Sequence, residues 1–194
     1  MGKGEATREA VLDEAGRMAR TVGLGGMTIG TLAASTQLSK SGLYAHFQSK
    51  EDLQLQVLEH AKARFVAQVI APALSAPRGE PRVRSLFEHK LRWDSAPGGC
   101  IFTSAATELD DQPGPVRDRV ARDERDWRDT IAEVFRTGVA EGHFRPDADP
   151  EQFAFDLEGV FLAHHLTSRL LDDSTAGERA WRSFEQLLAT ARVS

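Results

Sequence analysis

The stretch that decides the fold is TIGTLAASTQLSKSGLYAHFQSK, which runs from Thr28 to Lys50. Its pattern predicts two short helices joined by about three residues, the arrangement of a helix-turn-helix. Thr28 is the expected N-cap of the first helix and Ser39 of the second, because hydroxyl side chains satisfy free amides there. Apolar side chains stand where the two helices must touch, at Leu32, Ala33, Leu38 and Leu43.

The second of these helices has a polar and basic outer face. Lys40, Ser41 and Tyr44 are expected on that face, His46 comes just beyond it, and Gly42 allows a ligand close to the backbone. A helix this short buries little surface, and its outer face therefore has little structural role. The pattern favours a helix that reads a nucleic acid.

Charge along the chain favours the same function. The 194 residues carry a net charge of −5, yet residues 1–50 hold six basic and four acidic side chains. Residues 15–50 contain no acid at all. A basic surface free of carboxylates attracts a polyanion, because phosphate attracts lysine and arginine and repels carboxylates. Chance, combined with an apolar stretch that excludes all charges, is the competing interpretation.

Helical periodicity continues on both sides of this stretch. Val11, Ala15, Met18 and Val22 share one face of a preceding helix that glycines end. Ser49 is the expected cap of a long helix whose exit Pro72 and Pro77 bound. Asp149 and Pro150 are typical of another helix start. No alternating run of β-branched residues competes, so the sequence predicts an all-α fold of about nine helices.

The segment 28–50 resembles the DNA-binding domain of the tetracycline-repressor (TetR) family of transcriptional regulators. The residues that carry the resemblance are Thr28, Leu32-Ala33, Leu38-Ser39, Leu43-Tyr44, His46-Phe47 and Lys50, followed by Glu51-Asp52-Leu53. This chain departs from the family in the turn, where Gln37 stands at a place that often holds glycine. Gln37 must therefore adopt the turn without the conformational freedom of glycine.

The resemblance implies roles for individual residues. Thr28, Tyr44 and Lys50 are expected to bind phosphate oxygens, and Lys40 and Ser41 to face base edges. His46 serves either purpose or holds the helix end, and Phe47 is a core residue. A cation at a helix start, as at Lys50, is electrostatically unfavourable unless a phosphate compensates it. The predicted DNA-binding residues are Thr28, Ser39, Lys40, Ser41, Gly42, Tyr44, His46 and Lys50.

The predicted organisation is a helix-turn-helix domain at 1–50, a linking helix at about 50–70 and a second domain at 71–194. The helix that starts at Pro150 has two apolar faces, of which one needs a further partner. With the final helix it predicts a homodimer, which the resemblance also implies, although burial inside one chain is the alternative. The expected interface residues are Phe155, Gly159, Leu162, Leu166, Leu170, Trp181, Phe184 and Leu188. A two-fold dimer requires a palindromic operator.

The resemblance further implies a small effector bound between helices of the second domain, whose binding releases the operator. Candidate pocket residues are aromatic or polar on mostly apolar helices, although ordinary core packing explains each one alone. They are Phe87, Leu91, Trp93, Phe102, Trp127, Phe135, Phe161, His164 and His165. Neighbouring histidines cannot share a helix face, so one of His164 and His165 is expected to point inward.

Other functions find little support in the sequence. The spacings HxxxH and CxxC are absent, and no nucleophile motif, glycine-rich phosphate loop or pair of catalytic carboxylates stands out. We therefore expect no enzyme activity, metal or cofactor. We expect no signal peptide and no membrane span, since no 18-residue apolar run is present, and the lone Cys100 fits a reducing cytoplasm, with a redox role as an alternative. A helical carrier or sensor of apolar molecules that does not bind DNA remains the alternative function.

Overall fold

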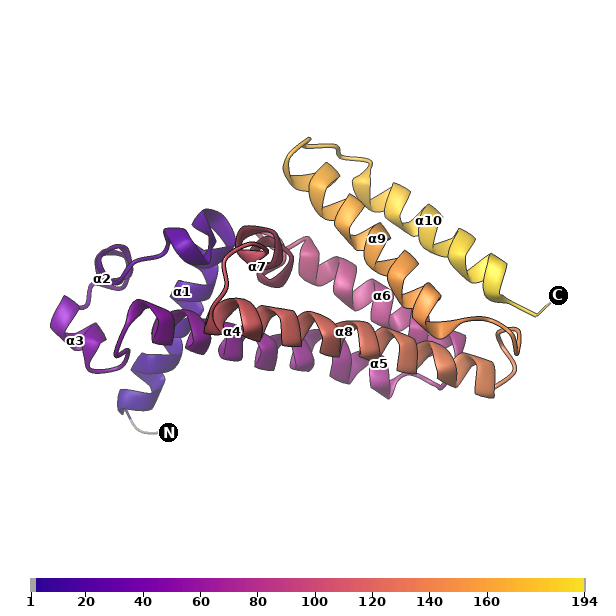
Figure 1. Ribbon diagram of the computed structural model, residues 1–194, viewed down its shortest axis with the longest axis horizontal. Coiled ribbons are helices and arrows are strands. Elements are labelled where there is room, and N and C mark those ends of the chain that lie inside the picture. Colours follow the sequence, from indigo (N-terminus) through magenta and orange to yellow (C-terminus); the bar gives the residue numbers. More distant parts are fainter. Residues whose placement is uncertain (1–2, 194) are drawn as a thin grey trace. The chain divides into compact units, whose positions relative to one another are not determined.

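The computed structural model describes residues 3–193, with side chains from Thr7 onward. Helices form most of this part (Figure 1), as predicted, and its only extended pairing is an isolated bridge between Phe144 and Arg192. Segment 50–75 is one continuous helix built from three labelled elements, which makes nine helices among the described residues. The elements are α1 (Lys3–Gly26), α2 (Ile29–Thr36), α3 (Lys40–Tyr44), α4 (Lys50–Phe65), η1 (Val66–Ile70), α5 (Ala71–Ser75), α6 (Glu80–Asp94), α7 (Ile101–Leu109), α8 (Pro115–Ala140), α9 (Pro150–Arg169) and α10 (Ala176–Ala191).

The chain divides into two packed units. Unit 1 comprises the described residues up to Arg64 together with Pro97–Asp123, and unit 2 comprises Phe65–Ala96 and the residues from Glu124 onward. This division follows a different line from the expected boundary at residue 71, because α7 and the start of α8 pack with the N-terminal helices. No periodicity of a single helix reveals such a pairing, which depends on the tertiary fold.

Unit 1 is built around the N-terminal helix. The buried stripe of α1 includes Val11 and Ala15 as expected, but it continues through Ala19 and Leu24. Val22, which was expected on the buried face, is 52% exposed. The helix breaks directly after Val22, at Gly23, whose φ of 79° and ψ of 166° turn the following residues, so that Leu24 is buried.

The long helix that follows passes Pro72 and ends at Ser75, between the two prolines expected to bound its exit. It passes through the π-helical turn η1 and continues as α5 to Ser75. A proline inside a helix removes an amide donor and crowds the carbonyl four residues earlier. A wider π turn directly before Pro72 accommodates this crowding within a continuous helix.

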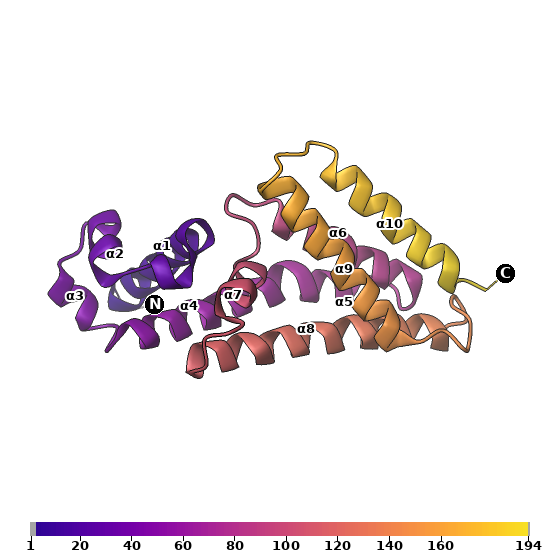
Figure 2. The ribbon, with the colours of Figure 1, turned by 45° about the horizontal axis from the view of Figure 1, so that its top comes forward.

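Unit 2 contains an antiparallel pair, α9 and α10, which lie side by side in both views (Figures 1 and 2). Phe87 of α6 joins the pair to the core, because its ring stacks on Phe184 at 4.0 Å and on Phe161 at 5.4 Å between centroids. A second stack places Phe135 between Phe144 and Phe153, at 4.4 and 4.1 Å. Aromatic stacking therefore fixes the helices of unit 2 against one another.

Ion pairs hold the C-terminal end of the chain onto α6. Arg192 donates two hydrogen bonds to the Glu80 carboxylate, at 2.8 and 2.6 Å. The Arg192 hydrogen bonds, assisted by Arg84, lower the pKa of Glu80 to about 2, against the opposing effect of burial. Arg84 also donates to Glu80 and to Glu185 of α10, so one network links α6, α10 and Arg192.

Candidate nucleic-acid interface

The α2–α3 pair is fixed by caps and a small apolar core. The Thr28 hydroxyl accepts from the Thr31 amide at 3.0 Å, and Ser39 accepts from the Gly42 amide at 3.0 Å, so both expected caps are confirmed. The buried side chains of this pair and the turn after it include Leu32, Ala33, Leu43 and Phe47. Gln37 takes the left-handed conformation in the turn, with φ 57° and ψ 23°. The caps and the turn together orient the outer face of α3.

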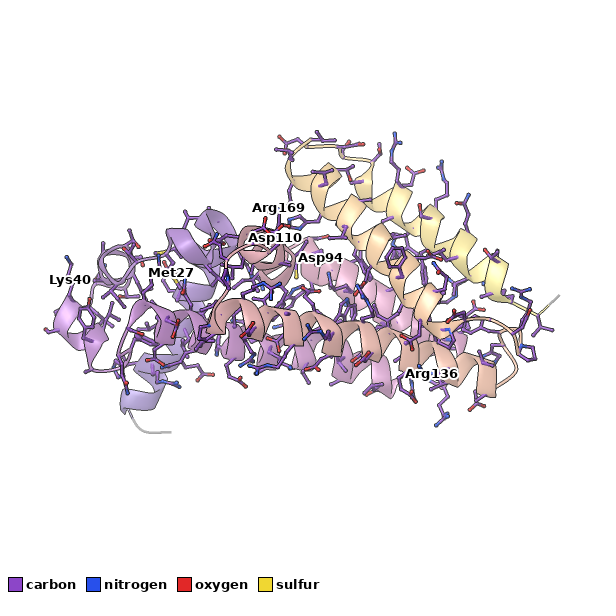
Figure 3. The ribbon with its side chains drawn as sticks, in the orientation of Figure 1. Met27, Lys40, Asp94, Asp110, Arg136 and Arg169 are labelled. Carbon is purple, nitrogen blue, oxygen red and sulfur yellow. The ribbon has the colours of Figure 1, made fainter. Side chains whose placement is uncertain are left out.

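That outer face is exposed and polar. Lys40, Ser41 and Tyr44 are all exposed, and Tyr44 keeps 57% of its surface accessible. Figure 3 shows the Lys40 side chain projecting from α3. Among the residues that the structure describes, no hydrogen bond or ion pair engages the Lys40 ammonium or the Tyr44 hydroxyl. Ser41 exchanges a hydrogen bond with Ser39 at 3.0 Å, while Gly42 and His46 are half-buried.

Gly30 lies close to two of the predicted DNA-binding groups. A Cβ atom built at this position would lie 3.7 Å from Thr28 Oγ1 and 3.8 Å from Lys40 Nζ. The start of α2 and the ammonium of α3 therefore border the same small surface. A side chain at Gly30 would project between them.

Lys50 has a partner that the sequence did not predict. Its ammonium donates to the carbonyl oxygen of Gly25 at 2.5 Å, at the C-terminal end of α1. A cation at the C-terminus of a helix is favourable, so this contact compensates the unfavourable place of Lys50 at the start of α4. A bound phosphate is not needed to explain its position.

The backbone amides of Leu24 and Gly25 also donate hydrogen bonds to a carboxylate. Glu108, in the last turn of α7, accepts from the Leu24 amide at 2.8 Å and the Gly25 amide at 2.5 Å. Gln54 donates to the Leu24 carbonyl at 2.8 Å. An acid at a helix C-terminus is unfavourable on its own helix, which is the one signal that singles out Glu108 in the sequence. These contacts tie α1, α4 and α7 together at the segment that leads into α2.

Asp52, two residues after Lys50, is engaged by hydrogen bonds. Asp52 accepts from the Gln48 amide and from Gln56, each at 2.9 Å. These hydrogen bonds, the one from Gln56 foremost, lower the pKa of Asp52. Asp52 is thus held by hydrogen bonds at the start of α4, and Ser49 accepts from its amide as the expected cap.

The predicted pocket residues fall into three groups. Phe87, Trp127 and Phe161 belong to one aromatic cluster of unit 2, because Phe161 lies 5.4 Å from Phe87 and 6.2 Å from Trp127. Trp93 joins it through Phe65, and Leu91 is also buried in this unit. Phe135 belongs to the separate stack with Phe144 and Phe153. Phe102 lies in unit 1.

His164 is the histidine that faces the core, with 5% of its surface exposed, and His165 is half-buried. Burial lowers the pKa of both imidazoles, and the Asp94 carboxylate opposes this shift. Asp94 itself forms a buried ion pair with Lys90, at 2.6 Å to each oxygen. The sequence analysis missed this pair, since charges four residues apart on a helix usually lie at the surface.

The outer face of α9 is apolar and exposed. Phe155, Leu162, Leu166 and Leu170 are 63, 57, 51 and 73% exposed, and Gly159 lies exposed between them. The prediction that Phe184 and Leu188 of α10 lie at the interface was wrong. Phe184 and Leu188 are fully buried and Trp181 packs 4.7 Å from Phe87, because this face of α10 fills the core of its own chain.

Other sites receive no support from the described residues. No three His, Cys, Asp or Glu side chains gather there as metal ligands. Cys100 precedes α7 and is 1% exposed, so oxidants have little access to its thiol. A search of the described helices finds none with the length and apolar character that crossing a membrane requires.

Comparisons with known proteins bear on both units. Residues 11–57 match the family model of bacterial regulatory proteins, tetR family, and residues 79–184 match that of the tetracyclin repressor-like C-terminal domain. A TetR transcriptional regulator from Chloroflexus aurantiacus J-10-FL is 27% identical, with a TM-score of 0.88 over 100% of both chains. SCO4454, a TetR-family transcriptional regulator from Streptomyces coelicolor, is 26% identical, with a TM-score of 0.81 over 96% of each chain.

A third solved structure has the same fold. AibR, in complex with isovaleryl coenzyme A and operator DNA, is 22% identical, with a TM-score of 0.74 over 96% of this chain and 98% of that chain. A comparison with curated proteins gave no match.

Proposed function

This chain belongs to the TetR family of transcriptional regulators, and from that premise we propose that it is a homodimeric repressor released from a palindromic operator by a small effector. The protein acts by binding and not by catalysis. Because its target is genomic DNA, its proposed location is the cytoplasm.

The exposed polar face of α3 is the observation that carries the proposal. Lys40, Ser41 and Tyr44 cover the outer face of α3. The helix is capped and its inner side chain is buried, so this polar outer face has little structural role. A helix of this kind enters the major groove, where side chains reach base edges while flanking groups hold phosphates. In this assignment Lys40 and Ser41 contact bases, and Thr28, Tyr44 and Lys50 contact phosphates.

Dimerisation follows from the exposed apolar face of α9. Each buried leucine or phenylalanine contributes about 1.5–3 kcal/mol, so four such side chains left in water favour association with a second copy. One short α3 reads only a few base pairs, whereas two related by a two-fold axis read a palindrome. The assembly therefore supplies both the affinity and the length of the recognised site.

An effector can release the operator only if its affinity differs between two conformations of the protein. The effector must bind more tightly to the conformation that does not hold DNA, and the operator then weakens effector binding by the same factor. AibR, with its bound isovaleryl coenzyme A and operator DNA, is a precedent for one protein of this fold carrying both kinds of ligand. The aromatic cluster of unit 2 is the proposed effector site.

The proposal is tested by selecting binding sites from random double-stranded DNA and measuring affinity by fluorescence anisotropy. We expect palindromic sites. A triple variant of α3, Lys40→Ala with Ser41→Ala and Tyr44→Ala, should lose at least a hundredfold in affinity for them. The matched control changes three polar residues of α10, Arg182→Ala with Gln186→Ala and Thr190→Ala, and should bind as the wild type does. Recovery of no DNA at low salt would instead favour a carrier of apolar molecules.

A further inference from the structure

Unit 2 contains a cluster of four ionisable side chains within its packed helices. Lys90 and Asp94 come from α6, and His164 and His165 come from α9. Lys90, Asp94 and His164 are each at least nine-tenths buried, with 4, 5 and 5% of their surfaces exposed. Among the labelled side chains in Figure 3, Asp94 lies at the end of α6. So many buried polar groups are costly in a core unless each finds a partner.

The charged members of this cluster satisfy each other. The Lys90 ammonium lies 2.6 Å from both Asp94 oxygens and 4.7 Å from the centre of the Phe161 ring. The carboxylate, the ammonium and the aromatic face therefore form a compensated group. It has no net charge to offer to a ligand.

The histidines differ from the ion pair in this respect. Nδ1 of His164 and Nδ1 of His165 are both buried, and neither has a hydrogen-bond partner among the described residues. A buried polar atom without a partner costs about 1–3 kcal/mol. Desolvation lowers the pKa of both rings, so each imidazole is neutral and offers one donor and one acceptor nitrogen.

We propose that this cluster is the polar end of the effector site and that the effector is a neutral aromatic or aliphatic molecule carrying a hydroxyl group. The inference rests on the proposed function and specifies the chemical class of its effector. A hydroxyl both donates and accepts, so it matches a neutral imidazole of either tautomer. Phe161 stacks on Phe87 beside Trp127, which supplies apolar surface for the body of the molecule.

Charge selects against the alternative classes. A carboxylate or an ammonium entering this site loses its hydration, and the buried Lys90–Asp94 pair is already compensated. A pure hydrocarbon leaves the histidine nitrogens without partners. The site should therefore prefer a hydroxylated molecule to a hydrocarbon or an anion of the same shape.

The experiment uses the full chain and three probes of one shape, which are 4-ethylphenol, ethylbenzene and 4-ethylbenzoate. Binding is measured at pH 7.5 by calorimetry and ligand-observed NMR. We expect 4-ethylphenol to bind about tenfold more tightly than ethylbenzene, and 4-ethylbenzoate more weakly than both. His164→Phe should reduce the preference for the phenol to less than twofold. His164→Asn, which keeps a polar group near the Nδ1 position, should retain most of it.

The matched control is His89→Phe on α6. The His89 Nδ1 atom already contacts the Ser85 carbonyl at 2.7 Å, so this change should leave the preference intact. Equal binding of phenol and hydrocarbon, tightest binding of the benzoate, or no binding of any probe each overturns the inference. So does an undiminished preference in both His164→Phe and His165→Phe. DNA binding by the same preparation separates these outcomes from a failure of the proposed function.

Discussion

Two exposed helix faces, one in each unit, contrast in chemistry. The outer face of α3 has Lys40, Ser41 and Tyr44, while that of α9 has Phe155, Leu162, Leu166 and Leu170. Exposure is ordinary for the first set, because water solvates lysine and hydroxyl groups well. It is unfavourable for the second set, because a contiguous apolar patch gains free energy when it is covered.

The contrast teaches how each face should respond to its surroundings. Contacts between cations and phosphates release counterions, so binding through α3 should weaken steeply as salt rises. Association through α9 depends on the burial of apolar surface and should depend little on salt. Each prediction below tests one side of this contrast.

The largest effect is expected from placing charges on the α9 face. Leu162→Glu combined with Leu166→Glu puts four carboxylates into a two-fold interface, where burial and mutual repulsion each cost several kcal/mol. We expect the dimer dissociation constant to rise at least a thousandfold, as measured by analytical ultracentrifugation. Helical content should remain unchanged by circular dichroism, because both side chains are exposed in the single chain.

The matched control alters exposed apolar residues elsewhere. Val66→Glu with Leu74→Glu changes side chains that are 41 and 46% exposed on η1 and α5. This variant should dimerise as the wild type does. Equal dissociation of both variants, or of neither, would remove the α9 face from the interface.

The next largest effect is expected from removing the Glu108 carboxylate, which binds the segment just before α2. Glu108→Ala removes the carboxylate that accepts from the Leu24 and Gly25 amides. Hydrogen bonds to a charged group contribute about 1.5–3 kcal/mol, so we expect unfolding to become easier by about 2 kcal/mol in urea denaturation. Amide exchange at Leu24 and Gly25 should accelerate. Glu133→Ala, an exposed acid of α8, is the control and should change stability by less than 0.5 kcal/mol, roughly the usual surface effect.

A comparison of two lysines tests the α3 face itself. Lys40 has no partner among the described residues, whereas Lys50 donates to the Gly25 carbonyl. Lys40→Ala should weaken operator binding about tenfold and relax preference at one base position, because Lys40 is assigned to a base edge. Lys50→Ala should weaken operator and random DNA alike and reduce the salt slope by about one. Anisotropy titrations at several salt concentrations separate the two patterns, and unchanged binding in both variants would contradict the assignments.

Acid should weaken unit 2 through Glu80. Hydrogen bonds from Arg192, with help from Arg84, lower the folded-state pKa of Glu80 from 4.5 to about 2. A depressed pKa stabilises the fold above the unfolded value, and this contribution disappears as pH falls from about 5 to 2. We expect a loss of about 1–2 kcal/mol, because water around the half-buried network screens the charges.

Thermal denaturation of the wild type and Glu80→Gln between pH 2 and 7 measures this contribution. The two proteins should differ most above pH 5 and converge near pH 2. A difference that stays constant over this range would show that protonation of Glu80 does not govern it. All three tryptophans lie in unit 2, so their fluorescence reports on the same unit.

The sequence alone predicted the elements whose signals are local. Caps at Thr28, Ser39 and Ser49 are visible because a hydroxyl three residues before an amide has a fixed partner. The exposed face of α9 is visible as a second apolar stripe on one helix. These features depend on residues only a few positions apart.

Features that depend on distant partners were not predictable. Glu108 meets Leu24 across 84 residues, and nothing near either position announces the contact. Phe184 and Leu188 have the same periodicity whether they face a second chain or their own core, so their burial required the structure. Lys90 and Asp94 form an ordinary surface spacing that the fold places inside.

The smallest expected effect is at the turn between α2 and α3. Gln37 has a φ of 57°, a left-handed conformation that costs a residue with a side chain about 1 kcal/mol relative to glycine. Gln37→Gly relieves this strain but gives the unfolded chain more freedom, so we expect a net gain of only about 0.5 kcal/mol. Ala34→Gly, within α2, is the control and should destabilise by about 0.5–1 kcal/mol. If Gln37→Gly leaves operator affinity unchanged, the turn only connects the helices; a loss of affinity despite greater stability would mean that the strained backbone holds α3 in its reading orientation.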